Sequence, residues 1–101
     1  IIITGDFNTT SNTEEFQVFL DADFKSVNRE GVTTRTYNAY DPTGTRGSLI
    51  DFIMLKNDRY TEVTYIVCEE TMNGEFISDH NAVISEMIFL PVYDSIEITN
   101  E

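Results

Sequence analysis

The order of the predicted elements places this chain in the α+β class. One short strand and one helix come first, and the rest is mostly strands. Short β-branched and aromatic runs with turn residues between them predict the strands, and one apolar stripe at i, i+3 and i+4 predicts the helix. At 101 residues the chain is one domain at most. We expect one mainly antiparallel sheet with one or two helices, because these strands are too few to build two facing sheets.

Composition and charge narrow the classes of function. Six Lys and Arg against eighteen Asp and Glu give a formal net charge of -12. Such a field repels a phosphate backbone, which argues against non-specific nucleic-acid binding, and it favours divalent cations. With 41% hydrophobic residues the chain can build a core. No apolar run reaches the roughly 20 residues of a membrane span.

The first predicted strand, residues 1–4, is β-branched throughout and should be buried on both faces. It runs into Gly5-Asp6-Phe7-Asn8. Gly5 permits a turn, and Asp6 and Asn8 then project polar groups from the carboxyl end of the strand, where α/β sheets commonly carry their sites. A Gly-Asp turn followed by an Asx turn, without any function, is the alternative interpretation.

The helix is predicted between residues 11 and 22. Ser11 and Asn12 are each followed three residues later by a glutamate, so either one fits a capping box. The apolar stripe comprises Phe16, Phe19 and Leu20. We expect the helix to end near Ala22, with the aromatic residues in the core.

The middle of the chain is less regular. Residues 33–37 form a possible short strand, and residues 38–47 are rich in Asn, Asp, Pro, Thr and Gly, which predicts a loop. Arg46 ends this loop and either reaches a phosphate or pairs with a surface acid.

Residues 49–55 form a strand that is apolar on both faces except at Asp51. A carboxylate in such a strand is costly unless it is paired. Either Asp51 satisfies local backbone donors, or it holds a polar or cationic partner such as His80.

Two further strands follow, at residues 62–69 and 82–90, with a turn at Asn73-Gly74 between them. The single Cys68 lies in the first of these, which excludes a disulfide framework and favours a small buried hydrophobe. We assign residues 1–90 to the domain and residues 91–101 to an acidic tail, which is either an edge strand or an extension toward another domain.

The only histidine, His80, directly follows Asp79 and precedes the last apolar run. Imidazole changes charge near neutral pH, and a neighbouring carboxylate sets its tautomer and pKa. Alone, an Asp-His step is more often a surface or capping pair, so its importance depends on partners elsewhere in the chain.

Three motifs stand in order: Gly5-Asp6-Phe7-Asn8, Ile50-Asp51-Phe52-Ile53 and Ser78-Asp79-His80-Asn81-Ala82-Val83. Together they resemble the carboxyl-terminal part of the endonuclease/exonuclease/phosphatase superfamily, the deoxyribonuclease-I-like fold, over roughly residues 1–90. The resemblance implies the carboxyl-terminal half of a four-layer α/β sandwich. It also implies a phosphodiesterase or phosphatase that uses Mg²⁺, with Mn²⁺ as the alternative.

The resemblance also assigns roles. Asp6 corresponds to the carboxylate that orients or deprotonates the attacking water, and Asn8 to the amide that contacts the phosphate. His80 would donate to a phosphate oxygen, with Asp51 as the buried partner that orients it. Asp79 would lie next to the metal, as would Asp6. The residue types fit phosphoryl transfer, which needs a positioned water and cations aimed at the developing charge.

The family's amino-terminal half, with its main metal-binding Glu, has no counterpart in this sequence. We therefore expect an exposed apolar face and an inactive chain that needs this missing half as a partner. A non-catalytic interaction module with the same fold is the alternative function. The substrate is expected to be a phosphate ester, whether nucleic acid, phospholipid or a small compound, and no targeting segment indicates a localisation.

Overall fold

The computed structural model describes residues 1–28, 31–56 and 59–90, and residues 91–101, predicted as a tail or edge strand, lie outside them. The elements, in chain order, are β1 (Ile2–Asp6), α1 (Glu14–Asp21), β2 (Lys25–Ser26), β3 (Asp51–Leu55), β4 (Tyr60–Cys68) and β5 (Ala82–Phe89). The α+β class is thus confirmed. No helix in the described part of the chain is long and apolar enough to cross a membrane.

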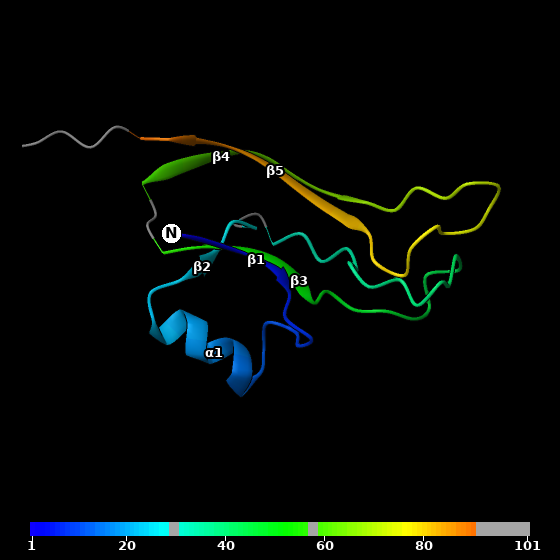
Figure 1. Cartoon of the computed structure of the whole chain (residues 1–101), viewed down its shortest axis with the longest axis horizontal. Helices are drawn as coiled ribbons and strands as arrows, with labels where there is room; N and C mark the ends of the chain where they lie inside the picture. Colours follow the sequence, from blue (N-terminus) through cyan, green and yellow to red (C-terminus); the bar gives the residue numbers. More distant parts are fainter. Residues whose placement is uncertain (29–30, 57–58, 91–101) are drawn as a thin grey trace, which may run out of the picture.

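The strands form two small sheets, so our expectation of a single sheet was wrong. One sheet has the order β1-β3-β2 and the other pairs β4 with β5, and all the pairings are antiparallel. The two sheets lie on top of one another, with α1 on the far side of the three-stranded sheet (Figure 1). The long hairpin of β4 and β5 folds over β3 because the second face of β3 is apolar and needs a cover.

Successive side chains of β3 point to opposite faces, and each face has its own cluster. Phe52 and Met54 pack with Phe16 of α1. Leu55 packs on the other side with Tyr60 of β4. This double cover explains why the predicted 49–55 strand is apolar on both faces apart from Asp51, although the regular strand begins only at Asp51.

Strand β1 contradicts the prediction of burial on both faces. It lies at the edge of its sheet, and only Ile3 of its isoleucines packs against the core. Ile2 is 54% exposed. A β-branched run therefore marks a strand correctly here, but the described residues provide no layer over one of its faces.

Helix α1 begins one or two residues later than the capping-box pattern predicts. Its N-cap is Thr13, whose hydroxyl oxygen accepts the N–H of Phe16 at 3.2 Å. The hydroxyls of Thr9 and Thr13 are hydrogen-bonded to each other, which fixes the cap and displaces Ser11 and Asn12 from that role. The C-cap is Ala22, as predicted.

The loop between β2 and β3 is organised by Arg35 in place of a strand. Its guanidinium donates to the carbonyl oxygens of Asn38, Arg46 and Asp41, and to the carboxylate of Glu69 at 2.8 Å. The predicted 33–37 strand is reduced to isolated bridges of Tyr37.

One glycine in this loop is required by its surroundings. Gly47 has a φ of +108°, and a Cβ added there would clash with the carbonyl oxygen of Tyr37. The close approach lets the chain return beside Tyr37, whose carbonyl accepts the N–H of Ser48 at 3.1 Å.

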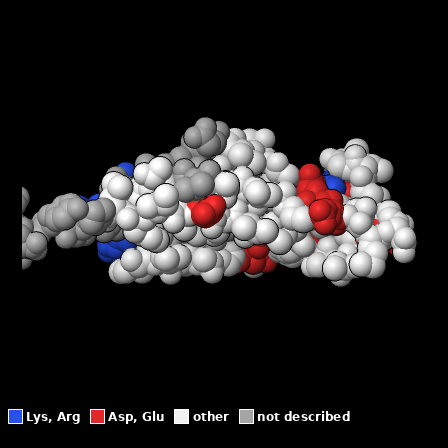
Figure 2. Space-filling view, turned by 90° about the horizontal axis from the view of Figure 1, so that it is seen from above, with Lys and Arg blue, Asp and Glu red and all other residues white. Residues whose placement is uncertain are grey.

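The outer face of the β4–β5 hairpin exposes isoleucines that no described residue covers. Ile66 and Ile84 are direct cross-strand partners and are each about half exposed, and Ile88 is 60% exposed. Figure 2 looks onto this side of the molecule and shows few charged side chains along its middle. The predicted exposed apolar face is present.

Candidate functional site

The two predicted site carboxylates of the three-stranded sheet are brought together by strand register. Asp6, the last residue of β1, pairs directly with Asp51, the first residue of β3. Residues opposite one another in an antiparallel pair point to the same face. Like charges in such a position repel each other, so the arrangement calls for a cationic partner.

His80 supplies that partner from the segment that leads into β5. Its Nδ1 lies 2.8 Å from Oδ2 of Asp51, and its Nε2 lies 3.6 Å from Oδ2 of Asp6. Asp6, Asp51 and His80 offer ligand atoms within 4.8 Å of one another. The predicted contact between Asp51 and His80 is confirmed, and the same ring also faces Asp6.

These carboxylates raise the pKa of His80 above its ordinary value of 6.5. The hydrogen bond with Asp51 is the largest cause, and the charges of Asp51, Asp6 and Asp79 add to it, while desolvation opposes the rise. The ring of Tyr37 lies beside the imidazole, with 5.5 Å between the centroids. The site therefore favours the protonated form of the ring.

Asn8 and Asp79 lie next to this group and not in it. The N–H of Asn8 donates to Oδ1 of Asp6 at 2.8 Å, with Asn8 in the left-handed region at a φ of 53°. This contact turns the chain away from β1 and fixes the Asp6 carboxylate. The carbonyl oxygen of Asp79 accepts the N–H of Asn38 at 2.7 Å, and its side chain is not part of the close group.

The donor set suits a hard divalent cation in part. Asp6 and Asp51 offer carboxylate oxygens, which are the ligands that Mg²⁺ prefers. Imidazole suits softer metals, and a protonated His80 is not a ligand at all. Because Asp51 is hydrogen-bonded to His80, Asp6 is the carboxylate of this group that fits a Mg²⁺, with His80 beside it as a hydrogen-bond donor.

Three buried polar residues behind the site were missed from the sequence: Thr36, Asn38 and Asn81. The side-chain amide of Asn38 donates to Oδ1 of Asn81 at 2.8 Å and to the carbonyl of Ser78 at 3.0 Å. Asn81 in turn donates to the carbonyl of Arg35 at 2.9 Å. Polar residues in a loop without periodicity resemble a solvated surface, so the sequence offers no signal for this network beyond the nearness of Asn81 to His80.

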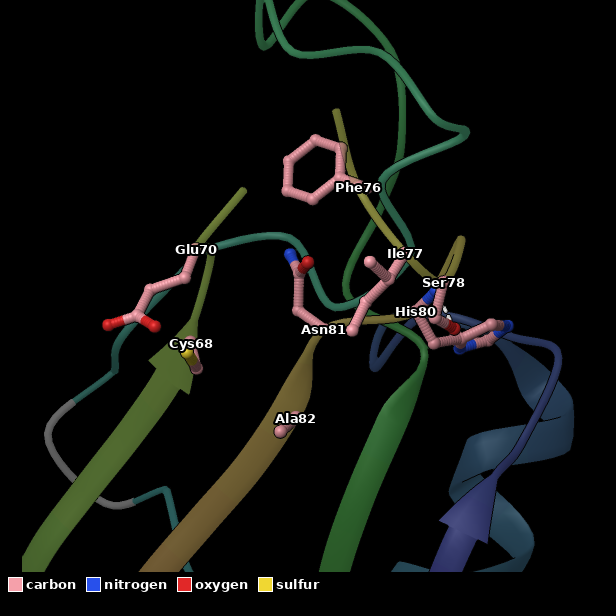
Figure 3. A pocket seen from close by; sticks show the side chains of 8 residues that line it. All are labelled: Cys68, Glu70, Phe76, Ile77, Ser78, His80, Asn81 and Ala82. Atoms are coloured by element: carbon pink, nitrogen blue, oxygen red, sulfur yellow. Dashed lines mark hydrogen bonds between the residues drawn. The ribbon is translucent and has the colours of Figure 1, made fainter. Parts of the chain in front are cut away.

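A pocket of about 330 Å³ lies between the end of β4 and the start of β5. Cys68, which we predicted to be buried, is only partly buried and lines it. Figure 3 shows the ring of His80 turned away from Cys68 and Ala82, toward the side where β1 and β3 lie. His80 lines the pocket but directs its ring toward Asp6 and Asp51, so the pocket and this group adjoin at His80.

Comparison with known proteins agrees with this geometry. A sequence model of the endonuclease/exonuclease/phosphatase family matches residues 1–80, which include the first two motifs and the Ser78-Asp79-His80 step of the third. The search of curated proteins gave no significant match. Because the family model covers most of the chain, it establishes the family to which the chain belongs.

The fold is also similar to a solved structure, the crystal structure of a functionally unknown conserved protein from Enterococcus faecalis V583. The TM-score is 0.73 at 22% sequence identity. The match covers 87% of this chain and 36% of that chain, so this chain spans about a third of the length of the solved protein. With its three motifs gathered where β1 ends and where β3 and β5 begin, the chain belongs to the endonuclease/exonuclease/phosphatase family.

Proposed function

We propose that this chain supplies the carboxyl-terminal half of the active site of a metal-dependent phosphoesterase. The carrying observation is the group of Asp6, Asp51 and His80, whose ligand atoms lie within 4.8 Å of one another. Two carboxylates around a favoured imidazolium match the needs of phosphoryl transfer, in which one group handles water and another meets negative charge.

The reaction is hydrolysis of a phosphate ester by in-line attack of water. Asp6 orients the water and accepts its proton as the oxygen–phosphorus bond forms. The side chain of Asn8 contacts the phosphate and helps to position the water. The ester oxygen on the opposite side leaves with the bonding electrons.

His80 stabilises the charge that develops on the phosphate oxygens. Asp51 holds Nδ1 at 2.8 Å, which leaves Nε2 as the donor. Nε2 lies 3.6 Å from Asp6, beyond ordinary hydrogen-bond length, so its N–H is available to a substrate oxygen. Asp51 is a positioning residue in this scheme, because it acts through the imidazole.

Asp6 and Asp79 would hold the metal, Mg²⁺ or alternatively Mn²⁺. A bound divalent cation supplies charge stabilisation to the phosphate and the leaving oxygen. Asp6 brings an exposed carboxylate, and the charge of Asp79 acts on the same imidazole.

A complementary amino-terminal half completes the site in this proposal. Two observations support it: the chain spans 36% of the solved protein that shares its fold, and the outer face of the β4–β5 hairpin exposes Ile66, Ile84 and Ile88. Exposed apolar faces of this kind favour a covering partner. The substrate class is phosphate esters, and the acidic chain favours a small or lipid-like ester over duplex DNA.

Two assays test the proposal. The isolated chain with Mg²⁺ should not turn over a generic phosphodiester or phosphomonoester, and robust turnover would contradict the need for a complementary half. In the full-length protein, His80→Ala should lower kcat by about 100-fold or more with folding unchanged. Glu15→Gln, at an exposed helix carboxylate, is the matched control and should retain activity.

The alternative function is a non-catalytic interaction module that keeps the same fold. The exposed isoleucines favour it as much as they favour an enzyme half. Full-length protein with no activity on any phosphate ester, or with activity that His80→Ala leaves unchanged, would support the interaction module.

A further inference from the structure

Thr36 lies between the two segments that carry the site, and its side chain is fully buried. Its hydroxyl oxygen accepts the N–H groups of both Ile50 and Asp51, each at 3.0 Å. The backbone at the first residue of β3 is therefore held by a side chain from a loop that is distant in sequence.

The backbone of Thr36 also bonds to the segment that carries His80, on the opposite side of the site. The carbonyl oxygen of Thr36 accepts the N–H of Asn81, the residue after His80, at 2.6 Å. Thr36 is thus bonded to Asp51 itself and to the neighbour of His80. Its own N–H donates to the carbonyl of Ser48 at 3.0 Å, which ties it to the loop as well.

We infer that Thr36 is a positioning residue, whose hydroxyl sets the distance between the Asp51 carboxylate and the His80 imidazole. The inference rests on the proposed function for its catalytic meaning, but the geometry that it concerns exists in the chain without substrate. Nothing else in the described part of the chain bonds to both Asp51 and the residue after His80.

The positioning role of Thr36 depends on its hydroxyl oxygen. An oxygen with two lone pairs accepts two backbone donors at once, which a methyl group cannot do. Loss of the oxygen leaves two backbone N–H groups beside a buried apolar surface, and the start of β3 must shift to satisfy them. A shift of Asp51 is transmitted directly to the ring that it holds.

The experiment uses the whole chain, free of metal, at one fixed pH, and observes the imidazole Nδ1–H proton by NMR. The chain has one histidine, so the signal has one source. Thr36→Val, which is nearly isosteric, should displace or broaden this signal and raise amide exchange at Ile50 and Asp51 about tenfold. Thr36→Ser keeps the hydroxyl and should keep both properties of the parent chain.

Two further variants separate positioning from general stability. Val27→Ala removes buried apolar contact at the far end of β3, in the cluster with Leu55 and Tyr60, and should speed exchange broadly without moving the imidazole signal. Should Thr36→Val not fold, Thr36→Cys gives a weaker acceptor and an intermediate signal. An imidazole signal that is unchanged in Thr36→Val, or in Thr36→Cys where only that variant folds, would overturn the inference.

Activity gives an independent readout. In the full-length enzyme we expect Thr36→Val to lower kcat about 10- to 100-fold at similar KM, with recovery in Thr36→Ser. If no phosphate ester is hydrolysed at all, the proposed function fails while the NMR experiment still decides the positioning role. If activity is found but the signal does not depend on the hydroxyl, only the role of Thr36 fails.

Discussion

The carboxylate of Asp51 is only 19% exposed, and a charge in that position needs compensation. His80 provides it. The carboxylates in turn stabilise the protonated imidazole, because they raise its pKa. A group whose pKa is higher in the folded chain than in the unfolded chain stabilises the fold when it is protonated. This contribution is fully present below about pH 6.5 and is lost as the pH rises through the folded-state pKa.

We therefore expect an NMR titration of His80, in chelator, to give a pKa above 6.5. Asp51→Asn should bring the pKa back toward that value, because the largest cause of the shift is removed. The free energy of unfolding of the parent chain should fall between pH 6.5 and the folded-state pKa, and the Asp51→Asn variant should show less of this slope. A parent value at or below 6.5 would contradict the pair.

A second residue-scale prediction concerns the glycines of the Arg35 loop. Gly44 and Gly47 both have positive φ, but only Gly47 has a backbone atom in the space of a Cβ. Gly44→Ala should cost about 1–2 kcal/mol from backbone strain. Gly47→Ala should cost about 3 kcal/mol or more, because the backbone of Tyr37 must also move.

Urea denaturation of the two alanine variants measures this difference. Equal costs would mean that the loop relaxes around the added carbon. Because Tyr37 also bridges to His80, Gly47→Ala should in addition perturb the imidazole signal, whereas Gly44→Ala should not.

The site was partly predictable at this scale, for physical reasons. A lone carboxylate inside an apolar strand is costly unless it is paired. The sequence alone therefore suggests that Asp51 pairs with His80. Thr36 and Asn38 could not be found in the same way, because a polar residue in a loop has the same sequence pattern whether it is solvated or buried. Only the three-dimensional course of the loop buries them.

At the scale of elements, local sequence patterns predicted where turns and the helix end better than they predicted which strands pair with one another. The Asn73-Gly74 step forms the expected tight turn, with φ values of 54° and 81° and a bridge between Met72 and Glu75. The end of α1 at Ala22 was also predicted. The division into two sheets was not, because strand pairing depends on contacts between distant residues that no local pattern encodes.

The start of α1 gives an element-scale prediction. Thr13→Ala removes the side-chain acceptor of the Phe16 N–H and should lower the free energy of unfolding by about 1 kcal/mol. Ser11→Ala, at one of the two positions that fit the capping-box pattern, should have an effect within about 0.5 kcal/mol. Chemical denaturation followed by circular dichroism compares them, and the opposite ranking would mean that the helix begins earlier in solution.

At the scale of the whole molecule, the chain is extended for its size. Its radius of gyration is 17.2 Å, against about 13 Å for a compact domain of 100 residues. One helix and two small sheets bury few side chains completely, so the stability depends on a small number of contacts. Among the residues that the structure describes, Met54 is the largest fully buried side chain.

This arrangement predicts a sharp contrast between the two hydrophobic surfaces. Met54→Ala should cost about 2–5 kcal/mol, because it leaves a cavity in the cluster beneath α1. Ile84→Thr, on the outer face of β5, should change the free energy of unfolding by no more than about 0.5 kcal/mol. Denaturant titration measures both, and a large loss at Ile84 would mean that the outer face is covered in solution, for instance by a second copy.

The hydrogen bonds of Arg35 to its loop affect which positions of the loop tolerate substitution. The guanidinium binds the carbonyl oxygens of Asn38, Asp41 and Arg46, groups that every amino acid possesses. An exposed position such as Pro42 can then change identity without altering what anchors the loop. Because main-chain groups anchor this loop beside the candidate site, its exposed side chains can be replaced during evolution while the backbone keeps its shape.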